Sequence, residues 1–169
     1  MTSKTVILQS GQELPADIIV TATGLKILIG GGAKISVDGT NLHPGDKYMW
    51  KGVMLQDLPN AAFVVGYTNA SWTLGADATA QMVTRLLNNM KKQGVTSFVP
   101  RKETEDEKDI NGKPMLDLTS TYIQAGLGEL PKSSAAKGQW KARSWYFRDM
   151  WEAKMGDVTT GLQLYRIST

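Results

Sequence analysis

Cysteine is absent from this sequence of 169 residues, and histidine occurs once, at position 43. Without cysteine the chain can form neither disulfides nor reactive thiolates, which is typical of a reducing compartment and predicts a cytoplasmic protein. A histidine-based zinc site or a Ser-His-Asp triad would have to be centred on His43. His43 lies in a turn-like stretch, residues 41–46 (NLHPGD), so we predict a surface loop there.

Long apolar runs are also missing. No stretch approaches the roughly 20 residues needed to cross a bilayer, so we predict no transmembrane segment. The apolar run at residues 6–8 is too short for a signal peptide and predicts a short strand instead. A net charge of +3 is well short of that of a dedicated nucleic-acid-binding protein. The length and a hydrophobic share of 41% are ordinary for one globular domain with a core.

Two apolar segments have the pattern of strands that are buried on both faces. Residues 17–22 (DIIVTA) form a β-branched run that stops at Thr23 and Gly24. Residues 62–65 (AFVV) form a second run, which stops at Gly66. Runs of this kind are typical of the middle of an α/β sheet, which is the fold class that we predict.

A β-hairpin is predicted over residues 34–42, because Asp38-Gly39 lies between alternating segments and both turn positions need positive φ. The glycines at 30–32 just before it could suggest a phosphate-binding loop. That motif needs a lysine that opens a helix, whereas Lys34 opens the hairpin. We therefore interpret the glycines as a break between elements.

One long helix is predicted from about Thr73, as N-cap, to Gly94, as C-terminal cap. Apolar residues recur along it with a 3.6-residue period and predict the buried face: Ala76, Ala80, Val83, Leu86, Leu87 and Met90.

The stretch that follows the helix is charged. Residues 101–117 hold four basic and six acidic residues and predict an exposed loop. This break suggests three parts: residues 1–98, a linker over 99–118, and a C-terminal extension over 119–169.

The C-terminal extension is rich in aromatic residues. Phe147, Met150, Trp151 and Met155 recur at helical spacing, and Gly156 is placed to end that helix. Six basic and two acidic residues between 132 and 154 leave single-stranded nucleic acid as an alternative ligand. Helical spacing favours an aromatic helix that packs on the body of the protein.

The predicted strand ends and the helix start suggest a ligand site. Ligands of open α/β sheets bind beyond the carboxyl ends of strands, and a helix N-terminus offers unpaired N–H groups. Gly24 and Gly66 would let the backbone approach a flat ligand such as a nucleotide. The alternative for each glycine is a plain structural turn.

At these residues the sequence resembles a known family. Residues 14–25 (LPADIIVTATGL) resemble the Ala-Thr-Gly strand of NADPH-dependent flavin monooxygenases. Residues 48–55 (YMWKGVML) and 58–74 (LPNAAFVVGYTNASWTL) are similar to the C-terminal part of Baeyer–Villiger monooxygenases of the ethionamide-activating type. Looser matches to that subgroup follow at Tyr122-Ile123-Gln124, Leu130-Pro131-Lys132, Trp140 and Tyr146-Phe147-Arg148-Asp149.

The glycine fingerprints with which this family binds FAD and NADPH are not found in the sequence. Residues 126–131 (GLGELP) begin like one but lack its third glycine. The resemblance therefore implies the last third of such an enzyme: a partial, Rossmann-like FAD-binding domain with a small hairpin, one long helix and a helical, aromatic extension. Residues 1–98 would be the C-terminal portion of the FAD-binding domain, and the extension would pack on the flavin and substrate region. We expect this piece to be inactive on its own.

The whole enzyme, by this resemblance, uses NADPH, FAD and O₂ to insert oxygen into a small-molecule ketone or to oxidise a sulfur compound. The alternative is a non-catalytic interaction or scaffold domain derived from the same fold. The resemblance implies no catalytic residue and no metal ligand in this part, and no nucleic-acid partner. It places Trp72 near the substrate and these residues near FAD: Thr23, Gly24, Gly66, Asn69, Thr73 and Leu74.

Overall fold

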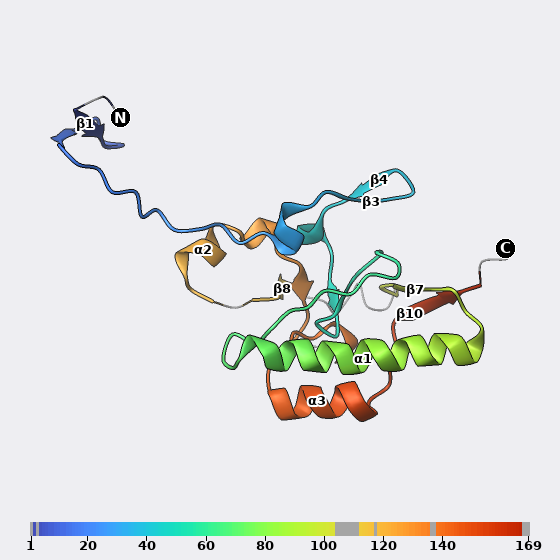
Figure 1. Ribbon diagram of the computed structural model, residues 1–169. Coiled ribbons are helices and arrows are strands. Elements are labelled where there is room, and N and C mark those ends of the chain that lie inside the picture. Colours follow the sequence, from blue (N-terminus) through green and yellow to red (C-terminus); the bar gives the residue numbers. More distant parts are fainter. Residues whose placement is uncertain (1, 3, 104–111, 117, 136–137, 167–169) are drawn as a thin grey trace.

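The computed structural model describes residues 2, 4–103, 112–116, 118–135 and 138–166, and it holds three α-helices in these ranges (Figure 1). They are α1 (Trp72–Gln93), α2 (Thr121–Gln124) and α3 (Tyr146–Met155). Short 3-10 turns are η1 (Ile29–Gly32), η2 (Pro44–Asp46), η4 (Leu127–Glu129) and η5 (Gly138–Trp140). The antiparallel strand pairs are β1 (Thr5–Ile7) with β2 (Glu13–Pro15), β3 (Ile35–Val37) with β4 (Thr40–Leu42), β5 (Met49–Trp50) with β6 (Met54–Leu55), β7 (Ser97–Pro100) with β10 (Leu162–Tyr165), and β8 (Lys113–Pro114) with β9 (Lys132–Ser133).

Helices and strands are mixed, as the α/β prediction requires, but the described residues contain no multi-stranded parallel sheet. Every sheet is a two-stranded ladder, and the one parallel pairing among them is the isolated bridge between Tyr48 and Lys132. The Rossmann-like character predicted for the FAD-binding part is therefore not confirmed. The three-part division of the chain stays a prediction, and residues 104–111 and 117 of its charged linker lie outside the described residues. The prediction of an exposed loop is wrong for Met115 and Leu116, which are buried in a core cluster just after β8.

The predicted buried strand at residues 17–22 is wrong. This stretch has no strand, and Ile18 and Val20 are 84% and 83% exposed. It belongs to an extended segment that carries the β1–β2 hairpin away from the body (Figure 1). An apolar run becomes a buried strand only where neighbouring strands complete its hydrogen bonds, and no described strand lies beside this one.

The second predicted buried strand, at residues 62–65, is also wrong. The segment is extended and Phe63 N–H donates to the carbonyl of Val53 at 2.7 Å, but it joins no ladder. Phe63 and Val65 are half-buried, whereas Val64 is 56% exposed. Because side chains of extended backbone alternate between two faces, only one face of this segment meets the protein.

The local predictions for the hairpin, the strand near the N-terminus and His43 are confirmed. Strands β3 and β4 are joined by Asp38 and Gly39, which have φ of 50° and 79°, as a tight primed turn needs. β1 covers part of residues 6–8, and the imidazole of His43 lies on the surface with 51% of it exposed.

The long helix is confirmed as α1, and Gly94 ends it in the left-handed conformation, with φ of 63°. Its N-cap is Ser71 rather than Thr73, because the helix begins two residues earlier than predicted. Its predicted face is correct for Leu86 and Met90 and wrong for Ala80 and Leu87, which are exposed. The buried residues are Gly75, Ala78, Thr79, Met82, Leu86 and Met90. The buried stripe differs from the predicted one because it includes the small residues Gly75, Ala78 and Thr79, which carry little hydrophobic signal.

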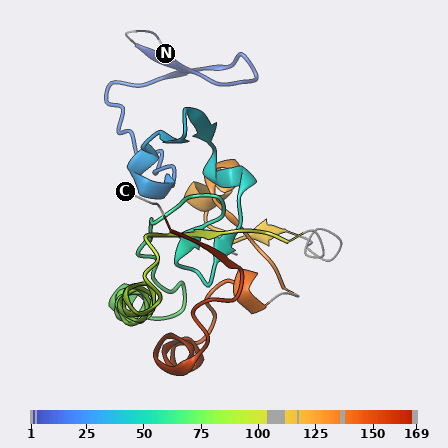
Figure 2. The same ribbon diagram turned by 90° about the vertical axis from the view of Figure 1, so that its right-hand side faces the viewer.

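The C-terminal helix is confirmed as α3 and ends at Gly156, but its predicted packing face is wrong. Of the four residues assigned to that face only Met150 is buried. The side that meets the body carries Tyr146, Met150 and Ala153, which join the core cluster of α1. Helices α1 and α3 lie side by side at the outer edge of the molecule (Figure 2).

The core is built around the short β5–β6 hairpin. Its strands send Trp50 and Met54 into one apolar cluster with α1, α3 and Trp140, while Met49 enters a second with Leu116 and Ile123. Trp50 and Trp140 are completely buried. A two-residue strand can serve two clusters because successive side chains point to opposite faces.

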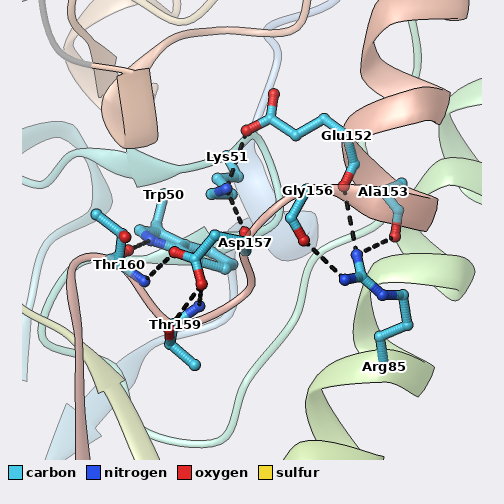
Figure 3. A network of polar contacts seen from close by, with 9 residues as sticks. All are labelled: Trp50, Lys51, Arg85, Glu152, Ala153, Gly156, Asp157, Thr159 and Thr160. Carbon is cyan, nitrogen blue, oxygen red and sulfur yellow. Dashed lines mark hydrogen bonds and ion pairs between the residues drawn. The ribbon is translucent and has the colours of Figure 1, made fainter.

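Polar contacts close the core at the end of α3 (Figure 3). The indole N–H of Trp50 donates to the carbonyl of Thr160 at 2.8 Å, and Lys51 Nζ contacts Glu152 at 2.9 Å. Arg85 of α1 donates to the carbonyls of Ala153 at 2.9 Å and Gly156 at 2.7 Å. These bonds satisfy carbonyls that the last turn of α3 would otherwise leave unpaired.

Candidate functional site

Residues 66–74, which form a loop and the first turn of α1, follow the extended segment, and the two ends of this stretch meet. We call this stretch the Trp72 loop. A Cβ atom on Gly75 would lie 2.5 Å from the carbonyl oxygen of Val65 and 2.7 Å from Cα of Gly66. Only glycine allows the first turn of α1 to approach the end of the extended segment this closely. The first turn of α1 therefore contacts the end of the extended segment, and the residues between them lie at the N-terminus of α1.

Trp72, the first residue of α1, folds back over Gly66. The indole occupies the space that a side chain at position 66 would need. Trp72 is still 54% exposed, so it forms a lid over Gly66 rather than a core residue. The structure thus brings the predicted residues Gly66 and Trp72 into contact. The absence of a side chain at Gly66 therefore serves packing against Trp72 within the chain.

Arg143 of the C-terminal extension holds the base of this loop. Its Nη1 donates to the carbonyl oxygens of Val65 and Gly75, both at 2.6 Å, and its Nη2 donates to Thr79 Oγ1 at 2.7 Å. One planar guanidinium therefore ties the extended segment to the first two turns of α1. Burial lowers the pKa of Arg143, and the nearby Tyr67 and Asp149 oppose that shift.

A second link joins the loop to the start of α3. The phenol of Tyr67 donates to Asp149 Oδ2 at 3.0 Å, and the backbone N–H of Ser144 donates to the same oxygen at 3.1 Å. Asn69 Nδ2 donates to the carbonyl of Ser144 at 3.2 Å. Burial raises the pKa of Tyr67, and the Asp149 carboxylate raises it further. Burial also raises the pKa of Asp149, although its hydrogen bonds to Tyr67 and Ser144 act in the opposite direction.

The N-terminus of α1 carries no side-chain cap. Ser71 is at the N-cap position, yet its hydroxyl pairs with the hydroxyl of Thr73 at 2.8 Å instead of bonding a backbone N–H. Trp72 and Thr73 are exposed, and Leu74 is half-buried. An uncapped first turn directs N–H groups and the positive end of the helix dipole outward, where they suit an electronegative ligand group.

An apolar cavity of about 420 Å³ adjoins this helix start. Trp72 forms part of its wall, together with residues 27–30 and 62–65 and three apolar residues from later in the chain: Met115, Leu116 and Leu130. The lining includes no acid, base or nucleophile. This cavity can hold an apolar small molecule, but it offers no side chain that could react with one.

A second cavity of about 420 Å³ shares Val65, Met115 and Leu116 with the first as lining residues. Gly66, Tyr67 and Thr68 contribute to its wall, as do Ser133 and Ser134 and the basic residues Lys113, Lys141 and Arg143. The two cavities therefore differ in chemistry, with an apolar one beside Trp72 and a basic, polar one beside Gly66.

Thr23 and Gly24 are not brought into this arrangement. Both lie in the exposed extended segment and line neither cavity. Gly24 has φ of 77°, and a Cβ there would meet nothing within 4 Å. The segment reaches the body three residues later, where Ile27 N–H donates to the carbonyl of Tyr122 at 3.3 Å.

Sequence reasoning missed the residues that anchor the loop. Tyr67 and Asp149 occur in stretches that carried the family resemblance, but nothing in the sequence links them. Arg143 sits in an unremarkable basic stretch, and it is 78 positions from Val65. A pairing over such a distance leaves no signal in a single sequence.

Comparison with known proteins gives a consistent set of relatives. The chain is 40% identical to the FAD-containing monooxygenase EthA of Mycobacterium tuberculosis over 157 residues, which are 93% of this chain and 31% of EthA. It is 40% identical to the probable FAD-binding monooxygenase AlmA of Acinetobacter baylyi and to the putative FAD-containing monooxygenase MymA of M. tuberculosis, each over 88% of this chain and 29% of the relative.

These relatives confirm the resemblance to flavin monooxygenases of the ethionamide-activating type. The chain spans about three tenths of their length. No protein-family model and no solved structure matches the chain. No helix of the described residues has the length and apolar character that a membrane span requires.

Proposed function

We propose that this chain forms the C-terminal part of an FAD-dependent monooxygenase of the Baeyer–Villiger type. The observation that carries the proposal is 40% identity to EthA over 93% of the chain. The whole enzyme would use NADPH and O₂ to insert oxygen into a ketone or to oxidise a sulfur compound. The cytoplasm, where NADPH is available, is its predicted location.

The N-terminus of α1 would face the flavin. Thr73 and Leu74 lie in a first turn without a side-chain cap, and the helix dipole there suits the negative charge of a reduced flavin. The N–H of Leu74 donates to the carbonyl of Ser71 at 3.2 Å, so the N–H groups at the start of the turn, such as that of Thr73, would be the ones offered to the cofactor. FAD would supply the oxygen chemistry, since the described residues that line the apolar cavity include no reactive side chain. Asn69 would shape the loop through its bond to Ser144. Thr23 and Gly24 would approach the cofactor only once the extended segment packs against other parts of the enzyme.

The apolar cavity beside Trp72 would receive the substrate. Its volume of about 420 Å³ and its apolar walls suit a small ketone or thioether. The hydrogen bonds of Arg143, Tyr67 and Asp149 hold the loop that carries Trp72, so they would keep this wall in place. The contribution of this chain would therefore be positional: one wall of the substrate site and one helix end toward the flavin.

A chimera tests the proposal. This chain replaces the matching segment of M. tuberculosis EthA, and the purified chimera is assayed for bound flavin and for NADPH oxidation that depends on a ketone or thioether. We expect about one flavin per chain and substrate-dependent NADPH oxidation, because the missing dinucleotide-binding parts are supplied by EthA. Unaltered EthA, purified in parallel, is the control.

The scaffold alternative gives a different result. A chimera that is folded and monodisperse but carries no flavin would favour a non-catalytic interaction domain. A chimera that holds FAD but oxidises NADPH at a rate independent of substrate would support the proposed contact of this chain with the flavin. It would contradict the proposal that this chain forms part of the substrate site.

A further inference from the structure

The outward side of α3 is strongly apolar. Trp145, at the N-cap of the helix, is 62% exposed, and Phe147, Trp151 and Met155 are 67%, 66% and 70% exposed. The three helical residues are spaced four apart and so follow one stripe along the helix. We call these four residues the outer face of α3. A patch of this kind on a short helix indicates an interaction surface.

The exposed charges on α3 itself are of one sign. The two acids of α3 turn toward the body, where Asp149 accepts from Tyr67 and Ser144 and Glu152 pairs with Lys51. The exposed charged residues of the helix are Arg148 and Lys154. The outer face is thus an apolar stripe flanked by two cations, which suits an anionic partner.

The shape of this region is convex. Seen end-on, α3 is the outermost element on its side of the molecule (Figure 2). None of the four residues of the outer face lines either of the two large cavities described above. A protruding ridge fits a flat, deformable surface better than it fits a bound strand of nucleic acid, which needs a groove or sheet platform.

We propose that the outer face of α3 binds the surface of an anionic phospholipid bilayer. Trp and Phe side chains are favoured at the level of lipid headgroups, and Lys and Arg attract anionic lipids while their stems stay in the interface. A second copy of this chain fits less well, because a symmetric contact between two outer faces would bring Arg148 and Lys154 of both copies together. Binding is peripheral, with α3 lying in the plane of the interface.

Vesicle binding tests the proposal with this chain and with the EthA chimera, in which the remaining parts of the enzyme are present. The protein is sedimented with vesicles of phosphatidylcholine alone and of phosphatidylcholine with phosphatidylglycerol, and its tryptophan emission is recorded. We expect binding that increases with phosphatidylglycerol, together with a blue shift as Trp145 and Trp151 leave water. The double variant Phe147→Ser/Trp151→Ser should bind at least about tenfold more weakly to both kinds of vesicle.

Two further variants separate charge from apolar contact. Arg148→Gln/Lys154→Gln should lose about tenfold in binding to phosphatidylglycerol vesicles and nothing on phosphatidylcholine. Leu87→Ser is the matched control. Leu87 is 53% exposed on α1, about 200° around the helix from Arg85, which contacts α3. Its loss should leave vesicle binding unchanged, and circular dichroism verifies that every variant is folded.

Three results would overturn the proposal. One is no binding to vesicles containing phosphatidylglycerol. Another is self-association that the Phe147→Ser/Trp151→Ser change abolishes, which would assign the face to a second copy. The third is tighter binding to a single-stranded oligonucleotide than to vesicles, which would assign it to nucleic acid.

Discussion

The guanidinium of Arg143 donates to the carbonyl oxygen of Gly75 at 2.6 Å, although the two residues are 68 positions apart. The same nitrogen bonds the carbonyl of Val65 at 2.6 Å, so the C-terminal extension holds the start of α1 against the extended segment. The loop that carries Trp72 therefore depends on a residue that lies outside it. The contribution of these Arg143 hydrogen bonds to stability can therefore be tested by substitution.

Arg143→Ala should lower the free energy of unfolding by roughly 2–4 kcal/mol, because two carbonyls and the Thr79 hydroxyl lose a charged donor in a half-buried place. Arg143→Lys should recover only part of this loss, since an ammonium lacks the planar fork. Urea denaturation measures both. Arg148→Ala, at an exposed arginine nearby, should stay within about 0.5 kcal/mol of wild type. Equal losses of unfolding free energy at the two arginines would contradict a stabilising role of the Arg143 hydrogen bonds.

Neighbouring leucines of α1 should differ sharply. Leu86 is 1% exposed and Leu87 is 53% exposed. Leu86→Ala should cost about 2–5 kcal/mol through lost burial and a cavity, whereas Leu87→Ala should change stability by less than about 0.5 kcal/mol. The two denaturation midpoints measured side by side decide this. A large effect of Leu87→Ala would restore the packing face predicted from periodicity.

Trp72→Ala, tested in the EthA chimera, should change the relative rates on small and bulky ketones while flavin content stays intact. The reason is that Trp72 forms part of the wall of the apolar cavity. With 54% of the side chain exposed, truncation should cost only about 1–2 kcal/mol of stability. If relative rates are unchanged and the melting temperature falls steeply, Trp72 has a packing role alone.

Asp57 should stabilise the fold at neutral pH. Burial acts to raise its pKa, but Lys47 at 2.7 Å and Arg101 at 2.6 Å outweigh burial and lower the pKa. A lowered folded-state pKa gives stability that is present above the unfolded value of about 3.9 and is lost as the pH falls through the folded value. Asp57→Asn should therefore be less stable than wild type near pH 7, and the difference should shrink in acid.

Asp149 should respond in the opposite direction, because burial raises its pKa. A raised carboxyl pKa means that the ionised form opposes folding above that pKa, and this cost disappears as the pH falls below the unfolded value. Relative to Asp149→Asn, wild type should therefore gain stability on acidification. Urea titrations at several pH values measure both differences. Parallel pH profiles for Asp57→Asn and Asp149→Asn would contradict the assigned shifts.

The chain by itself should neither retain FAD nor oxidise NADPH, because it lacks both dinucleotide-binding glycine fingerprints. Absorbance of the purified protein and an NADPH assay with a ketone measure this directly. A yellow preparation with about one flavin per chain, or ketone-dependent NADPH consumption, would contradict the expectation.

Features that depend on neighbouring residues were readable from the sequence. The periodicity of α1, its end at Gly94 and the Asp38-Gly39 turn each follow from local backbone preferences. The family resemblance was also available, because it rests on contiguous stretches such as residues 58–74. In these cases the conformation is set by residues that are neighbours in the sequence, so the sequence alone predicts it.

The tertiary structure alone decided which surfaces are buried. An apolar run such as residues 17–22 shows that burial would be favourable but not whether a neighbour exists, and in this structure it stays exposed. Likewise, helical periodicity places Trp151 and Ala153 on α3 without saying which of them meets α1; close packing selects the smaller Ala153. The contacts of Arg143 with Val65 and Gly75 join residues far apart in the chain, and only the folded arrangement creates them.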